Sequence, residues 1–537
     1  MKKQILSITA VCLVLAMLTG CAAIGSYFQQ LADLLWGENV HFKDMQYTRP
    51  DMENFQKVLE RCCQEAQTQT NIDQLEACIM EFYDEYGDFY TNYFLANIYY
   101  SKDLTDTYWE AENTFCMENS AEADAGLDRF YRTLAKSPLR ETLEGDDYFG
   151  SGFFADYEGE SLYDETFNAM LAQENALINQ YYAISGESGN MAYYSEAYFS
   201  IYGAQMAEIF RDLVQLRQEM AAYAGYDNYP DFAYDFHHTR DYTTQQAAAY
   251  LQQIQTQLTP LYTRLNSSGF WDMQLSYTSE QQTLSYVRQT AENMGGMLEE
   301  AFQTMVDGGL YDISYSPKKF NASFSVYLYA YQVPYVFVNP TMTEHDKLTF
   351  THEFGHFANY YVSGGGGAGV DVSEIFSQGL EYLSLCYAND VGNLEKIRMA
   401  SCLNTYVEQA AYAAFEQQVY GLEGEELTVE NIQQLYTEVG TAFGFTSWNW
   451  DPRDYVCITH FFTSPMYIIS YVVSNDAALQ LYQMEKAESG KGLACYTAHL
   501  HSQQAYLQAF LEEAGLESPF ASGRLETVKA TLETVLG

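Results

Sequence analysis

Basic residues are scarce in this chain of 537 residues, which has 26 lysines and arginines against 72 aspartates and glutamates. The formal net charge of −46 argues against a nucleic-acid-binding protein, because the phosphates would be repelled, and against a peripheral grip on anionic membranes. We interpret the acidity as that of a solvated surface. The alternative is an acidic site that recognises cationic substrates.

The cysteines lack the Cys-x-x-Cys spacing of a zinc module. Ten are present, of which Cys12 and Cys21 lie in an N-terminal leader pattern. Disulfides are permitted outside the membrane, but a chain of this size does not need them, and the spacings assign no pairs. Internal repeats and low-complexity runs are also missing, which leaves an ordinary globular chain with 47% hydrophobic residues.

The apolar run from Ile5 to Leu18 lacks the length of a transmembrane helix. It follows two lysines and ends in a Leu-x-Gly-Cys pattern at Cys21, which resembles the bacterial lipobox. We expect residues 1–20 to be a lipoprotein signal peptide and residues 21–45 a lipidated tether. The protein would then sit at the bacterial cell surface, on the outer face of the cytoplasmic membrane, and touch the membrane only through lipid on Cys21. The alternative is an ordinary secretory signal cut near Ala23.

A His-Glu-x-x-His motif, formed by His352, Glu353 and His356, is the strongest functional signal. Positions i and i+4 of a helix project from one face, so the two imidazoles can hold one zinc ion. Glu353 lies one residue round, where it can take a proton from a water at the metal without binding the metal. The alternative is a pair of histidines satisfied within a core.

The segment around this motif has the features of a buried helix. Thr343 is a candidate N-cap, with Asp346 three residues later in a capping-box arrangement. From residue 347 to residue 362 there is no proline, and the only glycine is Gly355. The side opposite the histidines carries Phe350, Phe354 and Phe357.

Glu374 is the predicted third ligand. It follows a glycine loop at residues 364–367 and stands among apolar neighbours, namely Val372, Ile375, Phe376 and Leu380. A lone carboxylate in such a place needs a charged partner, and a zinc ion would be that partner. Two histidines, one glutamate and an open water position are typical of a catalytic zinc, with one ion per chain.

The rest of the chain has mostly helical periodicity. We predict helices over Met52–Ala66, Ile72–Tyr86, Phe167–Ala183, Ala204–Gly225 and Gln245–Leu265, with more helix from Glu280 to Asp307. One stretch is rich in β-forming residues and predicts a hairpin of Phe324–Tyr331 and Pro334–Val338. Its edge could pair with an extended peptide, or the hairpin could be purely structural.

His460, Tyr467 and Tyr471 form a second candidate group. The tyrosines are four residues apart, which predicts one face of a helix, and their phenols could donate hydrogen bonds to an oxyanion. The alternative is that both pack in the core. Asp371 and Glu381 are candidates for orienting the histidines, or else are solvated or capping carboxylates.

Together these segments resemble the thimet oligopeptidase and oligoendopeptidase F family of zinc peptidases, and the oligoendopeptidase F branch more closely. The resemblance runs from about Leu213 to Leu481 and rests on Leu216–Tyr229, Pro334–Asn339, His352–His356, Asp371–Gln378 and His460–Tyr471. It implies zinc ligands at His352, His356 and Glu374, a general base at Glu353, and transition-state donors among His460, Tyr467 and Tyr471.

The resemblance also implies the architecture and the activity. We expect a mainly α fold of two helical lobes around a deep central channel, with one small β-hairpin near the metal helix. The N-terminal helical lobe would span residues 46–235 and the catalytic lobe residues 236–537. The expected function is a zinc metalloendopeptidase that hydrolyses short peptides. The alternative is a non-catalytic surface lipoprotein that binds peptides, although binding alone does not require Glu353.

Overall fold

The computed structural model describes residues 40–145, 148–187, 194–268, 275–365, 368–446 and 449–537. The predicted signal peptide, the tether up to residue 39 and Cys21 lie outside the described residues, as do two glycines of the predicted loop, Gly366 and Gly367. Within the described ranges, no helix is both long enough and apolar enough to cross a membrane.

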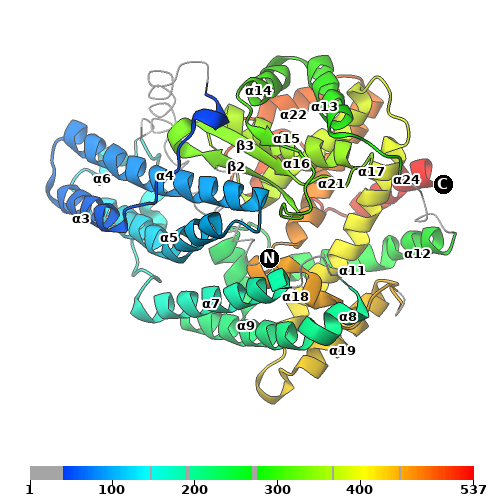
Figure 1. The fold of residues 1–537 in the computed structure, drawn as a ribbon, viewed down its shortest axis with the longest axis horizontal. Coiled ribbons are helices and arrows are strands. Elements are labelled where there is room, and N and C mark those ends of the chain that lie inside the picture. Colours follow the sequence, from blue (N-terminus) through cyan, green and yellow to red (C-terminus); the bar gives the residue numbers. More distant parts are fainter. Residues whose placement is uncertain (1–39, 146–147, 188–193, 269–274, 366–367, 447–448) are drawn as a thin grey trace.

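Three long helices form the N-terminal part of the fold: α3 (Met52–Thr68), α4 (Ile72–Lys102) and α5 (Thr107–Leu134). Each helix has an N-cap residue whose side chain accepts hydrogen bonds from backbone amides of the first turn. These N-caps are Asp51, Asn71 and Asp106. α4 continues well beyond the predicted end at Tyr86, because the aromatic residues that follow keep the helical period and are buried. The short helix α6 (Arg140–Leu143) follows α5, and these helices gather on one side of the molecule (Figure 1).

A second group of helices lies below the first in Figure 1 and includes α7 (Glu165–Glu187) and α9 (Ala204–Tyr223), which pack together. Between α7 and α9 lies α8 (Glu196–Tyr198), and after α9 come α10 (Tyr229–Phe232), α11 (Thr244–Gln257) and α12 (Thr259–Ser267). The prediction of a single helix over Gln245–Leu265 is wrong. The helix breaks at Leu258 because Pro260, in the first turn of α12, has no amide proton and excludes a continuous helix.

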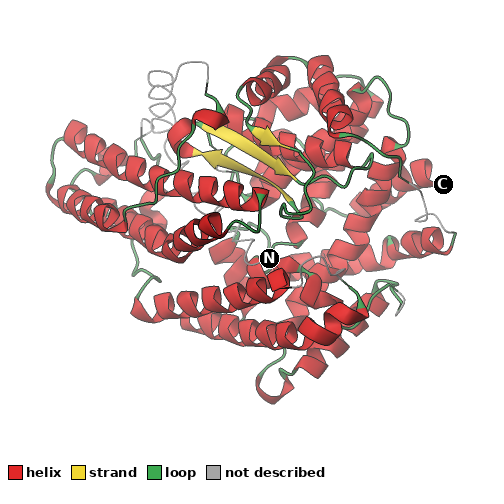
Figure 2. Ribbon diagram, in the orientation of Figure 1, coloured by secondary structure: helices red, strands yellow, loops and turns green. Residues whose placement is uncertain are grey.

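The β-structure is a three-stranded sheet of β1 (Tyr311–Asp312), β2 (Ser323–Leu328) and β3 (Val333–Val338), in the order β1-β3-β2. β2 and β3 form the predicted hairpin, in antiparallel register from Ser323↔Val338 to Leu328↔Val333. β1 adds a parallel strand that the sequence did not predict. β2 is therefore an edge of the sheet. In Figure 2 the sheet is drawn in yellow and lies among the helices.

Three helices that follow the sheet in the chain form the core around the candidate site: α15 (Asp346–Ser363), α16 (Val370–Tyr387) and α21 (Ile469–Ala487). α15 packs on β2 and β3 on one side and on α16 on the other, and α16 packs along α21. The surrounding helices are α13 (Glu280–Met294), α14 (Gly296–Asp307), α17 (Leu394–Asn404), α18 (Ala410–Val419), α19 (Val429–Ala442), α20 (Thr459–Thr463), α22 (Lys491–His499), α23 (Leu507–Ala514) and α24 (Arg524–Leu536).

The start of α15 differs from the predicted capping box. The helix begins at Asp346, and the Thr343 side chain makes no capping bond. Instead the Asp346 carboxylate accepts hydrogen bonds from the backbone amides of Thr341 and Thr343, at 2.9 and 3.0 Å. The Asp346 carboxylate, at the first helical position, thus binds the backbone that precedes the helix. Its negative charge also interacts favourably with the positive end of the helix dipole. The predicted lobe boundary at residue 235 stays a prediction.

Candidate metal centre

His352 and His356 lie one turn apart on α15, with ring centroids separated by 5.0 Å. The opposite face of the helix is anchored by the three predicted phenylalanines, each at most 1% exposed. This burial fixes the rotation of α15 about its axis, because turning the helix would expose the phenylalanines. Both imidazoles therefore face α16.

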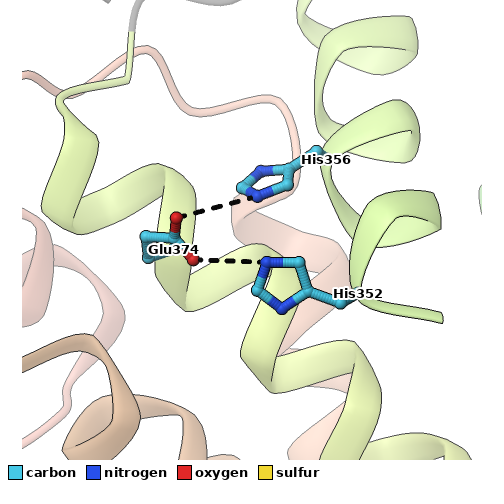
Figure 3. A group of neighbouring side chains, drawn as sticks. All are labelled: His352, His356 and Glu374. Atoms are coloured by element: carbon cyan, nitrogen blue, oxygen red, sulfur yellow. Dashed lines mark ion pairs between the residues drawn. The ribbon is translucent and has the colours of Figure 1, made fainter. Parts of the chain in front are cut away.

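Glu374 comes from the second turn of α16 and meets the histidines (Figure 3). Its Oε2 lies 3.4 Å from His352 Nε2, and its Oε1 lies 3.9 Å from His356 Nε2. One ligand atom from each of the three residues lies within 4.8 Å of the other two. Two imidazole nitrogens and one carboxylate oxygen, converging in a mostly buried place, form a donor set that suits a zinc-like divalent cation.

Glu381 orients His352, as the sequence suggested it could. Its Oε1 lies 2.8 Å from His352 Nδ1, and its Oε2 lies 2.9 Å from Nε of the buried Arg398. Burial alone would raise the pKa of Glu381, but Arg398 and His352 lower it below its usual value. The ionised carboxylate accepts the Nδ1 proton and leaves Nε2 free to bind a metal.

The carboxylates of Glu381 and Glu374 also favour the protonated form of His352. Burial alone would lower the pKa of its imidazole, but Glu381 and Glu374 raise it to about 9. The pocket without a cation therefore attracts positive charge, which is what a metal site requires.

His356 is oriented by Ser373, which the sequence analysis missed. Ser373 Oγ lies 3.2 Å from His356 Nδ1. The only sequence signal is that Ser373 directly precedes a predicted ligand. Asp371, the other proposed orienting residue, has a different partner: its Oδ2 lies 3.5 Å from Nε of Arg240, and its backbone oxygen accepts from Ser474.

Glu353 is buried between α15 and the edge strand. Ser325 Oγ, on β2, donates at 2.9 Å to Glu353 Oε2 and lies 3.0 Å from the Glu353 backbone oxygen. Burial raises the pKa of Glu353 above its usual value, and His352 and Ser325 partly counter this effect. A carboxylate that is fixed in place and made more basic is suited to proton transfer.

His460, Tyr467 and Tyr471 converge on the same region. The Tyr467 hydroxyl donates to Glu374 Oε1 at 2.8 Å, and His460 Nε2 lies 3.2 Å from the Tyr471 hydroxyl. Burial lowers the pKa of His460 to about 4, so its imidazole is neutral at pH 7. The prediction of one shared helix face for the two tyrosines is wrong, because Tyr467 precedes α21 and only Tyr471 lies within it.

Comparison with protein families gives a match of residues 42–161 to the Peptidase M3 N-terminal domain. The chain is a peptidase that resembles the M3 family. Among solved structures it is similar to an oligoendopeptidase F, with TM-score 0.82 and 20% identity over 93% of this chain and 98% of that one. It is also similar to an inhibitor-bound Pz peptidase A, with TM-score 0.81 and 19% identity over 92% and 99%, and to an oligoendopeptidase F from Bacillus anthracis str. Ames, with TM-score 0.78 and 20% identity over 93% and 98%. A search of curated proteins finds no match.

The mainly helical fold predicted for this M3-like peptidase is confirmed, together with its small β-sheet. At identities near 20% the solved structures show a shared fold. The family match adds the enzyme class, and the cluster of His352, His356 and Glu374 adds a possible metal site, so the coarse function is that of a metallopeptidase.

Proposed function

We propose that this M3-like peptidase is a zinc-dependent endopeptidase that hydrolyses short oligopeptides, with Glu353 as its general base. The observation that carries the proposal is the position of Glu353. It is buried next to the cluster of His352, His356 and Glu374 and is held by Ser325 of the edge strand. A protein that only bound peptides would have no use for a basic carboxylate in this place.

His352 and His356 would hold the zinc ion from α15 and Glu374 would hold it from α16. When bound, zinc supplies a Lewis acid for the scissile carbonyl and lowers the pKa of the attacking water. Glu381 and Ser373 keep the two imidazoles turned towards the ion.

Proton transfer is the work of Glu353. Its carboxylate takes a proton from the attacking water and later delivers a proton to the leaving amine. Ser325 keeps the carboxylate from rotating during both steps. The raised pKa of Glu353, caused mainly by burial, makes the carboxylate a better acceptor than an exposed glutamate.

Negative charge on the carbonyl oxygen would be stabilised by the group of His460, Tyr467 and Tyr471. Because His460 is neutral, the group offers hydrogen bonds and no full charge, and each donor removed should cost on the order of 10²–10³ in kcat. The two tyrosines have different contacts, which supports different roles for them. Tyr467 contacts the ligand Glu374, whereas Tyr471 contacts His460.

The substrate would bind in extended form along β2. This strand is an edge of the sheet, and its Ser325 touches the base, so a peptide paired with β2 passes next to Glu353. Shared fold with oligoendopeptidase F structures supports short peptides as substrates. The membrane anchor at Cys21 is part of the same proposal, and recovery of the wild-type protein in the membrane fraction, with lipid on the N-terminal cysteine, would support it.

Glu353→Gln tests the mechanism, because the amide keeps the size of the side chain and still accepts from Ser325 but cannot take a proton. We expect one zinc per chain, near-normal peptide affinity, and a kcat on a quenched peptide lower by roughly 10²–10⁴-fold. Wild-type turnover in this variant would refute Glu353 as the base. A wild-type protein with full zinc, tight peptide binding and no turnover would instead support the alternative of a non-catalytic peptide-binding lipoprotein.

A further inference from the structure

The segment between α20 and α21 makes an uncommon turn. Tyr467 N donates to Ser464 O at 3.2 Å, Pro465 is the second residue, and Met466 is the third, with φ +64°. Proline followed by a residue of positive φ is the pattern of a type II turn, in which the third position favours glycine or asparagine. A methionine here is strained unless its surroundings impose the conformation.

Three buried side chains hold the backbone of this turn. His238 Nε2 donates to Pro465 O at 2.9 Å, Met466 N donates to Glu416 Oε1 at 2.7 Å, and Arg240 Nη1 donates to Met466 O at 2.9 Å. None of the three side chains is more than about 3% exposed. His238 and Arg240 follow the π-helical turn Ala233–His237, and Glu416 lies on α18. We call His238, Arg240 and Glu416 the turn clamp.

Arg240 extends the turn clamp to the helices that carry the site. Its Nη2 donates to Ser470 Oγ at 2.8 Å, in the first turn of α21, and its Nε lies 3.5 Å from Asp371 Oδ2, in the first turn of α16. The guanidinium also lies over the Tyr234 ring, 4.4 Å from its centroid. One buried cation thus contacts the turn, the helix of Tyr471 and the helix of Glu374.

Tyr467 directly follows Met466, and its hydroxyl is 2.8 Å from the ligand Glu374. A change in the peptide planes around Met466 would therefore move the phenol relative to the metal ligands. Stability alone does not explain this arrangement, because apolar packing around a glycine turn would be less costly than three buried polar side chains.

We propose that the turn clamp is a positioning device that holds Tyr467 in the geometry required for oxyanion stabilisation. The inference rests on the proposed peptidase function. It assigns His238, Arg240 and Glu416 as positioning residues that touch neither substrate nor metal. A displacement of the donors by about 1 Å is enough to lower turnover by roughly 10²-fold.

A pair of variants at Glu416 tests the proposal. Burial raises the pKa of Glu416 to about 8, although the Met466 amide and Arg240 lower it, so a neutral acceptor reproduces the native contact. Glu416→Gln keeps an oxygen for Met466 N, and we expect it to retain most of kcat. Glu416→Met keeps the size but loses the acceptor, and we expect kcat to fall by roughly 10–100-fold, with KM within about threefold and one zinc per chain.

Glu112→Met is the matched control. Glu112 is also a buried carboxylate, but it lies on α5 and binds Arg49 and Tyr47 of the segment before α3, so its loss should lower Tm and leave kcat within about twofold. Wild-type kcat in Glu416→Met overturns the proposal. So does a loss of kcat that comes with lost zinc or with a proportional rise in KM, because that pattern indicates a general structural role.

If Glu416→Met does not fold, His238→Phe decides by the same criteria, since it keeps a ring and loses the bond to Pro465 O. Glu353→Gln is measured alongside. If the wild-type protein itself shows no Glu353-dependent hydrolysis, the proposed function fails. If it does and Glu416→Met is fully active, only the turn clamp fails.

Discussion

Gly355 lies between His352 and His356, where α15 is in close contact with α16. A Cβ added at this position would lie 2.7 Å from Phe376 O and 2.7 Å from Ser377 Cα, both backbone atoms of α16. Ordinary contacts of a Cβ begin at 3.4 Å, so the helices would have to separate by about 3.4 − 2.7 = 0.7 Å. Backbone atoms cannot rotate aside, and the whole separation must therefore be taken by movement of one helix against the other.

This separation acts directly on the proposed metal site, because the histidines lie on α15 and Glu374 lies on α16. Metal–ligand distances tolerate changes of only about 0.2 Å. We therefore expect Gly355→Ala to weaken zinc binding by at least about 10-fold, with a matching loss of activity at limiting zinc. Overpacking should cost about 1–3 kcal/mol of unfolding free energy, of which the better helix propensity of alanine returns up to about 1 kcal/mol.

Zinc affinity is measured by competition with a chromophoric chelator, and stability by denaturant titration of the metal-free protein. Gly379→Ala is the matched control on α16. Its nearest contact would be Leu481 Cδ1 at 2.9 Å, the end of a side chain that can move, so zinc affinity should stay within about threefold of wild type. Wild-type zinc affinity in Gly355→Ala would refute the idea that helix contact at this glycine sets the ligand geometry.

Two further predictions concern the site and the pH dependence of stability. Glu381→Gln should weaken zinc binding by about 10–100-fold, because the amide cannot serve both His352 and Arg398; the same chelator competition tests this, and unchanged affinity would contradict the orienting role. Burial raises the pKa of Asp124 to about 7, although bonds from Tyr90 and Tyr86 lower it, so the folded protein holds this proton more tightly than the unfolded chain. The resulting stability is present below about pH 4 and is lost as the pH rises through about 7, with an upper limit of about 4 kcal/mol. Asp124→Asn should therefore show a smaller fall in Tm from pH 5 to pH 8 than the wild-type protein. An equal fall in both proteins would contradict the raised pKa of Asp124.

Local patterns were sufficient for the helices whose apolar residues keep one period. Met52–Ala66 was predicted to within two residues of α3, and the hairpin around Pro334 was predicted because its strands are rich in β-branched and aromatic residues. Pro260 marks the break between α11 and α12 in the sequence, but the apolar period around it predicts one continuous helix. β1 has only two residues and pairs with a strand more than twenty residues away, so no local signal predicts it.

The sequence by itself determined the pairing of His352 with His356, because their spacing places both imidazoles on one helix face whatever surrounds them. It also pointed to Glu374, since a carboxylate among apolar neighbours requires a charged partner. Only the tertiary structure decided which groups support these residues. Ser325 donates to Glu353, and Arg240 donates to the backbone of Met466. The two residues of each pair lie far apart in the sequence. Hydrogen bonds between such segments depend on how whole helices pack, and helix packing leaves no periodic trace in the residues that it brings together.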